Sequence, residues 1–95
     1  MQNVLSFQRY LRNNQIFSQY NLNRIGVFGS FARDDANAND IDILIEDDID
    51  PDKLIELKTL LESSFHKKVD MVIKKYANPI VLYRAQKDLL YATQY

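Results

Sequence analysis

The stretch that decides the fold is Arg24-Ile25-Gly26-Val27-Phe28-Gly29-Ser30-Phe31-Ala32-Arg33, followed after a polar loop by Asp40-Ile41-Asp42-Ile43-Leu44-Ile45. The apolar run at its start predicts a short buried strand. The chain then turns at Gly29 and Ser30, where backbone N–H groups can face an anion. We expect Ser30 to be the N-cap of a helical turn. The second apolar run predicts another strand.

That second run begins with two aspartates, Asp40 and Asp42, separated by one residue. On a strand this spacing places both carboxylates on one face, with Ile41, Ile43 and Ile45 on the other. The apolar face can be buried while the acidic face stays open. Because like charges repel each other, we expect a cation between them. Two carboxylates beside a turn that suits a phosphate indicate a Mg²⁺-nucleotide site.

The composition predicts one globular domain over residues 1–95. Hydrophobic residues make up 46% of the chain and the charges are mixed, which argues against a disordered protein. No apolar run approaches the ~20 residues of a membrane helix, and no signal-peptide pattern is present, so we expect a cytoplasmic location. The absence of cysteine excludes disulfides and thiolate sites. A net charge of −1 argues against broad nucleic-acid binding.

Outside the motif, local patterns predict a further strand and several helices. The predicted helices cover residues 3–13, 14–20 and 51–65, and a last one runs from Pro79 towards Tyr95. Asp50 is expected as the N-cap of the third helix, with Pro51 at its first position. The third strand is predicted over 68–73. We therefore expect an α/β (α+β) fold, with a three-stranded mixed sheet flanked by about four helices.

The third strand carries one aspartate, Asp70, inside an apolar run. Burying a carboxylate is costly unless it is paired or bound to a metal. By itself, Asp70 fits equally well as an edge-strand residue facing water or as a salt-bridge partner of Lys67 or Lys68. Its occurrence together with Asp40 and Asp42 favours a catalytic role.

The order of an apolar strand, Gly29-Ser30, a loop and Asp40-Ile41-Asp42 resembles the nucleotidyltransferase signature of the DNA polymerase β superfamily. The form Gly29-Ser30-Phe31-Ala32-Arg33 most resembles the minimal nucleotidyltransferases (MNT), which are usually encoded beside a HEPN-domain protein and act as its antitoxin. The resemblance covers about residues 22–75. The loop before Asp40 is one residue shorter than is common in that family, and Asp34 replaces the glycine that commonly follows the arginine.

This resemblance implies a role for each residue of the motif. It implies two Mg²⁺ ions held by three carboxylates, those of Asp40, Asp42 and Asp70. Gly29 and Ser30 would bind the β- and γ-phosphates of ATP, and Arg33 could screen a phosphate.

The implied function is the transfer of AMP from ATP to a tyrosine of a HEPN-type RNase toxin. The chain is too short for a separate acceptor domain, so we expect a partner to supply the acceptor surface. The main alternative is a non-catalytic antitoxin that neutralises its partner by complex formation. An antibiotic or small-molecule nucleotidyltransferase is disfavoured, because we expect no second domain that could hold the drug.

The predicted last helix carries more apolar residues than a single core-facing stripe can hold. They are Ile80, Val81, Leu82, Tyr83, Leu89, Leu90, Tyr91 and Tyr95. The excess predicts an exposed patch through which a hetero-oligomer would form, with Leu89 and Tyr91 as test positions. A helix buried more deeply is the competing interpretation.

Overall fold

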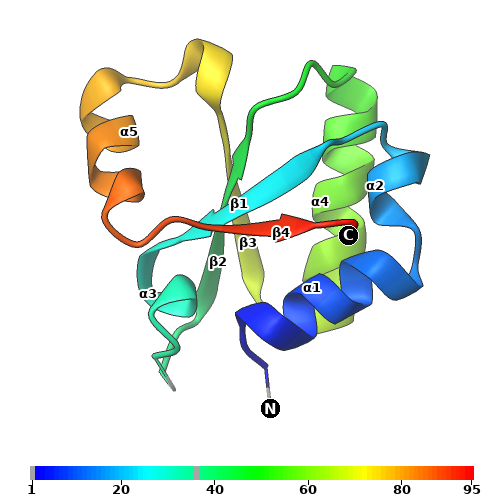
Figure 1. Ribbon diagram of the computed structural model, residues 1–95, viewed down its shortest axis with the longest axis horizontal. Coiled ribbons are helices and arrows are strands. Elements are labelled where there is room, and N and C mark those ends of the chain that lie inside the picture. Colours follow the sequence, from blue (N-terminus) through cyan, green and yellow to red (C-terminus); the bar gives the residue numbers. More distant parts are fainter. Residues whose placement is uncertain (1, 36) are drawn as a thin grey trace.

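The computed structural model describes residues 2–35 and 37–95, and its strands form one mixed sheet in the order β3-β2-β1-β4 (Figure 1). The strands are β1 (Arg24–Phe28), β2 (Asp40–Ile45), β3 (Lys68–Ile73) and β4 (Leu90–Thr93). β1 pairs antiparallel with both β2 and β4, and β2 pairs parallel with β3. The mixed α/β class is confirmed, but the described residues form four strands where three were expected.

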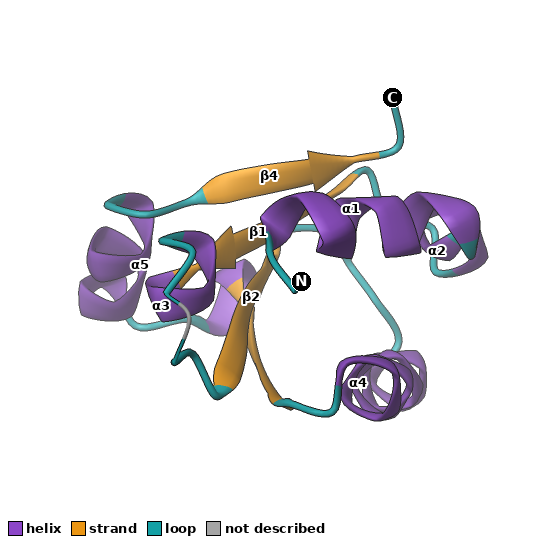
Figure 2. Cartoon of the chain, turned by 90° about the horizontal axis from the view of Figure 1, so that it is seen from below, coloured by secondary structure: helices purple, strands orange, loops and turns teal. Residues whose placement is uncertain are grey.

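The helices are short except for the one that connects the two parallel strands. They are α1 (Val4–Asn13), α2 (Ile16–Gln19), α3 (Gly29–Ala32), α4 (Pro51–Phe65), the 3-10 helix η1 (Lys74–Tyr76) and α5 (Pro79–Gln86). Figures 1 and 2 both show α5 at one end of the molecule, with α2 and α4 at the other. Among the described residues, no helix combines the length and the apolar character that crossing a membrane requires.

The core lies between the sheet and the helices α1, α2 and α4. Ile41, Ile43 and Ile45 of β2 are fully buried there, as the alternation along the strand predicts. Begun by Asp50 as N-cap and Pro51, α4 contributes Leu57, Leu61 and Phe65. The opposite face of the sheet therefore carries Asp40 and Asp42, away from this core.

Three aromatic rings connect the core to the turn after β1. The ring centroid of Phe7 lies 6.1 Å from that of Phe31 and 5.3 Å from that of Phe65. Phe7 is fully buried and Phe31 almost so, which anchors the short helix α3 on α1. The position of Gly29 at the start of α3 is consequently set by core packing.

The C-terminal part of the chain differs from the prediction. The last helix ends at Gln86, and residues 90–93 form the strand β4 beside β1, with Ile25 opposite Ala92. The expected helix towards Tyr95 is therefore wrong. Leu89 lies in the turn before β4 and Tyr91 lies on the strand, so neither residue belongs to a helical interface.

Glu46, directly after β2, ties this end of the sheet together. Its carboxylate accepts hydrogen bonds from Arg24 Nε at 2.8 Å, Lys74 Nζ at 3.2 Å and the Tyr91 hydroxyl at 3.1 Å. Partial burial raises the pKa of Glu46, but these hydrogen bonds outweigh it and lower the pKa below its ordinary value. The Arg24 guanidinium also stacks 3.7 Å from the ring centre of Tyr91, which fixes β4 against β1.

Candidate active site

Three carboxylates lie on the face of the sheet that points away from the core. Asp40 and Asp42 alternate with buried isoleucines along β2, and both are half-buried. Asp70 lies on the neighbouring strand β3, where the parallel register places it directly beside Asp42. Neighbouring strands are about 4.8 Å apart, so the structure brings the three predicted carboxylates to one region of one face.

Their mutual repulsion contributes to a raised pKa of Asp42. Partial burial raises the pKa of Asp42, and the nearby charges of Asp70 and Asp40 raise it further. Arg33 and Lys68 act in the opposite direction without cancelling the effect. The centre of this region thus carries negative charge that the protein neutralises only in part.

Two observations qualify the metal site that the sequence predicts. Lys68 Nζ lies 3.6 Å from Oδ1 of Asp70, and this carboxylate on the edge strand is also partly exposed. Both features fit the alternative interpretations of Asp70, as a residue facing water and as a salt-bridge partner of a lysine. In the part of the chain that the structure describes, no three acidic, histidine or cysteine side chains are grouped so that they could hold a metal ion. The carboxylate oxygens are the kind of donor that Mg²⁺ prefers, but they are spaced too widely here to enclose an ion.

Gly29 occupies a backbone conformation that its position requires. Its φ of +73° is in the left-handed region, and a Cβ built on it would collide with the Asp42 carboxylate. The glycine therefore lets a carboxylate approach the backbone of the turn. The predicted cap at Ser30 is wrong: α3 already starts at Gly29, so Phe28 is its N-cap, and Ser30 lies within the helix.

We predict that Gly29→Ala disrupts this turn. The left-handed conformation costs a residue with a Cβ about 1–2 kcal/mol, and the new methyl group must also displace Asp42. We expect a loss of stability of at least that size in urea unfolding, together with loss of nucleotide binding in calorimetry. Ser30→Ala is the control, since Ser30 has no positive φ; equal stability of the two variants would contradict the prediction.

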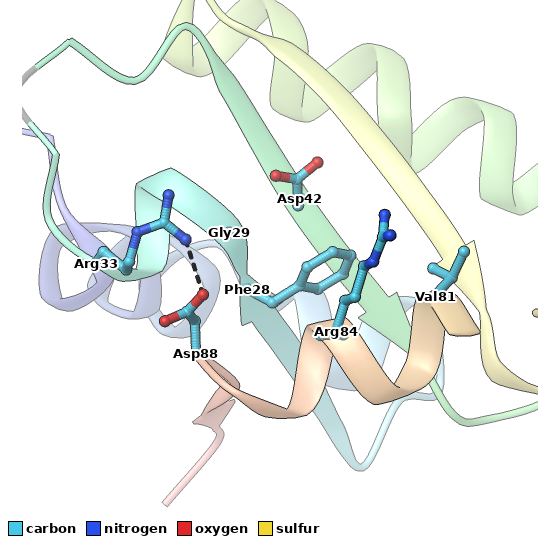
Figure 3. Close-up of a pocket in the computed structure, with 8 residues that line it drawn as sticks. Phe28, Gly29, Arg33, Asp42, Val81, Arg84 and Asp88 are labelled. Atoms are coloured by element: carbon cyan, nitrogen blue, oxygen red, sulfur yellow. Dashed lines mark hydrogen bonds and ion pairs between the residues drawn. The ribbon is translucent and has the colours of Figure 1, made fainter. Parts of the chain in front are cut away.

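A pocket of about 390 Å³ opens beside this turn (Figure 3). It is lined by Phe28, Gly29, Arg33, Asp42, Val81, Arg84, Ala85 and Asp88. One wall comes from β1, α3 and β2, and the other from α5 and the turn that follows it. Of the predicted site residues, Gly29, Arg33 and Asp42 line this pocket, whereas Ser30, Asp40 and Asp70 lie outside its lining.

Arg33 is held by a partner that the sequence did not indicate. Its Nη1 lies 2.8 Å from Oδ2 of Asp88, which joins the end of α3 to the turn after α5 (Figure 3). This ion pair connects the two walls of the pocket. The Arg33 side chain is about half exposed, so we assign the pair a role in positioning rather than a large contribution to stability.

The residues of the second wall were missed as site residues. Val81, Arg84, Ala85 and Asp88 follow the spacing i, i+3, i+4, i+7, which places them on one side of a helical segment. An arginine and an aspartate at that spacing among apolar residues were a signal of a polar function. The prediction treated the segment only as an apolar interface and overlooked this pair.

Comparison with known proteins agrees with the motif. The family described as "Polymerase beta, Nucleotidyltransferase" matches residues 12–94. A Methanocaldococcus jannaschii protein named "Putative protein adenylyltransferase MJ0126" is 37% identical over 81 residues, which cover 81% of this chain and 83% of that protein. "Protein adenylyltransferase MntA" of Thermococcus cleftensis is 30% identical over 80 residues, 81% of each chain.

Solved structures share the fold. A toxin–antitoxin structure with AMP-PNP aligns with a TM-score of 0.66 at 24% identity, over 85% of this chain and 69% of that one. A structure described as a tri-AMPylated Shewanella oneidensis HEPN toxin in complex with MNT antitoxin aligns with a TM-score of 0.57 at 24% identity, over 90% and 71%. The chain therefore belongs to the polymerase β nucleotidyltransferase family, and protein adenylyltransferases are among its relatives.

Proposed function

We propose that the protein is a Mg²⁺-dependent protein adenylyltransferase, an antitoxin that transfers AMP from ATP to a tyrosine of a HEPN-type RNase toxin. The observation that carries the proposal is the position of Asp42, which lines one pocket with the Gly29 turn and lies beside Asp70 in the sheet. The names of the relatives support protein adenylylation, and a protein of the same fold is described in complex with an AMPylated HEPN toxin. Since ATP is a cytoplasmic metabolite, the proposal also places the protein in the cytoplasm.

The carboxylates fit a divalent cation by their chemistry. They are oxygen donors whose negative charge the protein neutralises only in part. Burial raises the pKa of Asp42, and repulsion from Asp70 and Asp40 raises it further. A bound cation would relieve this repulsion. Asp40 and Asp42 would hold two Mg²⁺ ions, with Asp70 completing one of the sites. When bound, Mg²⁺ would neutralise phosphate charge and lower the pKa of the attacking hydroxyl.

The other residues orient the nucleotide and the acceptor. The backbone N–H groups of Gly29 and Ser30 would contact the β- and γ-phosphates, and Arg33 would screen phosphate charge from the edge of the pocket. Asp70 lies on the edge strand β3 with its side chain 41% exposed. A tyrosine hydroxyl of another protein can reach that edge and transfer its proton to this carboxylate.

The exposed face of α5 is where we propose that the toxin docks. Ile80 and Tyr83 are 61% and 66% exposed, although both are large and apolar. Val81 continues this face into the pocket, so a protein bound on α5 would reach the nucleotide. Lys75 lies over the ring of Tyr76 in the 3-10 helix just before α5, which favours a partner with acidic residues.

We predict that Tyr83→Ala weakens toxin binding by about tenfold or more, as for an aromatic residue at the centre of an interface. The melting temperature should change little, because Tyr83 is exposed. Calorimetric titration with the toxin measures the first effect and thermal unfolding the second. Ile55→Ala is the matched control, because Ile55 is 64% exposed on α4, at the far end of the molecule (Figure 1). Equal losses of affinity in the two variants would remove α5 as the docking face.

The activity itself is tested by mixing the purified chain with the HEPN-domain protein of the same genome, Mg²⁺ and ATP labelled in the α-phosphate. We expect label on a tyrosine of the HEPN protein, loss of its RNase activity, and no transfer when a chelator removes the metal. Inhibition of the RNase without transfer of label would show instead a non-catalytic antitoxin that acts by complex formation.

A further inference from the structure

We propose that Arg84 binds the β- and γ-phosphates of the nucleotide from the α5 wall of the pocket. The inference rests on the proposed function, because it assigns a further residue to the same nucleotide. Arg84 lies on α5, outside the Gly29-Ser30 and Asp40-Ile41-Asp42 motifs.

The pocket contains two guanidinium groups in different situations. Arg33 is paired with Asp88 at 2.8 Å, so its charge is already balanced within the protein. Arg84 lines the same pocket, yet it forms no salt bridge with any carboxylate of residues 2–35 and 37–95. In Figure 3 its side chain extends from α5 between Phe28 and Val81. Arg84 is thus the pocket cation whose charge is wholly available to a ligand, whereas Arg33 would share its charge between Asp88 and a phosphate.

The position of Arg84 suits the phosphates in particular. The α-phosphate has to lie near Asp42, where transfer takes place, on the wall that also carries Gly29. A group on the opposite wall can then contact the remaining phosphates and oppose the charge that the leaving pyrophosphate develops. A guanidinium presents a planar fork of donors that matches two phosphate oxygens at once.

A structural role for the charge is the competing explanation. Arg84 lies in the last turn of α5, where a cation interacts favourably with the helix dipole. Lys87 is the C-cap of the same helix and supplies the same kind of charge, but it does not line the pocket. Comparing the two residues therefore separates ligand binding from stabilisation of the helix.

The test measures dissociation constants by calorimetry for three probes: Mg²⁺-ATP, inorganic tripolyphosphate with Mg²⁺, and AMP with Mg²⁺. We expect Arg84→Gln to weaken ATP and tripolyphosphate binding by about ten- to a hundredfold, the usual effect of losing a charged hydrogen bond. AMP binding should change less than about twofold, because AMP lacks both phosphates. Lys87→Gln should leave all three constants unchanged. Arg84→Lys, which keeps the charge but not the fork, should lie between wild type and Arg84→Gln and carries the test if the latter does not fold.

Three results would overturn the inference. They are unchanged ATP affinity in Arg84→Gln, an AMP loss as large as the ATP loss, and a wild type that does not bind tripolyphosphate. The AMP result would place Arg84 at the base or the ribose instead. If the wild-type protein transfers AMP and Arg84→Gln has an unchanged dissociation constant for ATP, the inference is contradicted but the proposed function is not. ATP binding that depends on Arg84 in a protein that transfers nothing contradicts the proposed function alone.

Discussion

Asp42→Asn should reduce transfer of AMP to the toxin by at least about a hundredfold. Mutating a residue that only hydrogen-bonds to a metal ligand already costs about 10–100-fold in metal affinity or activity, and Asp42 is proposed as a ligand itself. Asparagine keeps the shape of the side chain but removes the charge that a metal would use. The fold should persist without cost, since Asp42 is repelled by Asp70 and Asp40 in the native protein. We expect an equal or slightly higher melting temperature in the absence of metal and nucleotide.

The measurement is the initial rate of label transfer, with toxin affinity and melting temperature determined on the same preparation. Asp52→Asn is the matched control, because it makes the same chemical change on the exposed first turn of α4, outside the pocket. It should transfer at the wild-type rate. If Asp42→Asn loses transfer but still protects cells from the toxin as well as the wild type does, catalysis is not the protective mechanism.

Phe7→Ala should destabilise the fold by about 3–5 kcal/mol, the usual cost of deleting a buried phenyl ring. Phe7 is fully buried and its ring packs against Phe31 and Phe65, so no neighbour can fill the space easily. Domains of this size are stable by about 5–15 kcal/mol, which makes the loss a large part of the total. Because Phe31 anchors α3, nucleotide binding at the Gly29 turn should weaken even at temperatures where the variant is still folded.

Urea unfolding of wild type and variant measures this change in the free energy of unfolding. Leu5→Ala serves as the control on the same helix, since Leu5 is 62% exposed and its substitution should change stability by less than about 0.5 kcal/mol. A cost below about 1 kcal/mol for Phe7→Ala would mean that the aromatic cluster does not hold α3.

The elements with complete local patterns were predicted from the sequence. The apolar runs over 24–28 and 68–73 coincide with β1 and β3, and the amphipathic segment 51–65 coincides with α4. In α4 the signal is local at both ends. Asp50 and Pro51 begin the helix, and His66 ends it in the left-handed conformation of a C-cap. Such signals act over a few residues and do not depend on the rest of the fold.

The strand β4 could not be predicted in this way. Residues 90–93 are compatible with a helix or a strand, and what selects the strand is pairing with β1, where Thr93 lies opposite Arg24. That partner is far away in the sequence, so no window along the chain contains it. The tertiary pairing overrides a weak local preference.

The candidate site divides along the same line. The motif predicted that the turn at Gly29 and the carboxylate of Asp42 would meet, and the structure brings both into one pocket. The roles of the motif residues stay predictions until transfer is measured. Arg84 and Asp88 line the pocket because α5 and the turn after it lie opposite the Gly29 turn, an arrangement that the local sequence pattern does not specify.

The edges of the two outer strands, β3 and β4, are protected against self-association. An open strand edge carries unpaired N–H and C=O groups that recruit other strands and start aggregation. On β4 the outward N–H of Thr93 donates to Gln8 and its C=O accepts from Arg12, both from α1, so a helix occupies part of that edge. On β3, the charged side chains of Lys68 and Asp70 disfavour pairing of the other edge with a further strand. Asp70 would thus have a second role besides the metal binding proposed above. Replacing it with an apolar residue would leave this strand edge open to amyloid-like pairing.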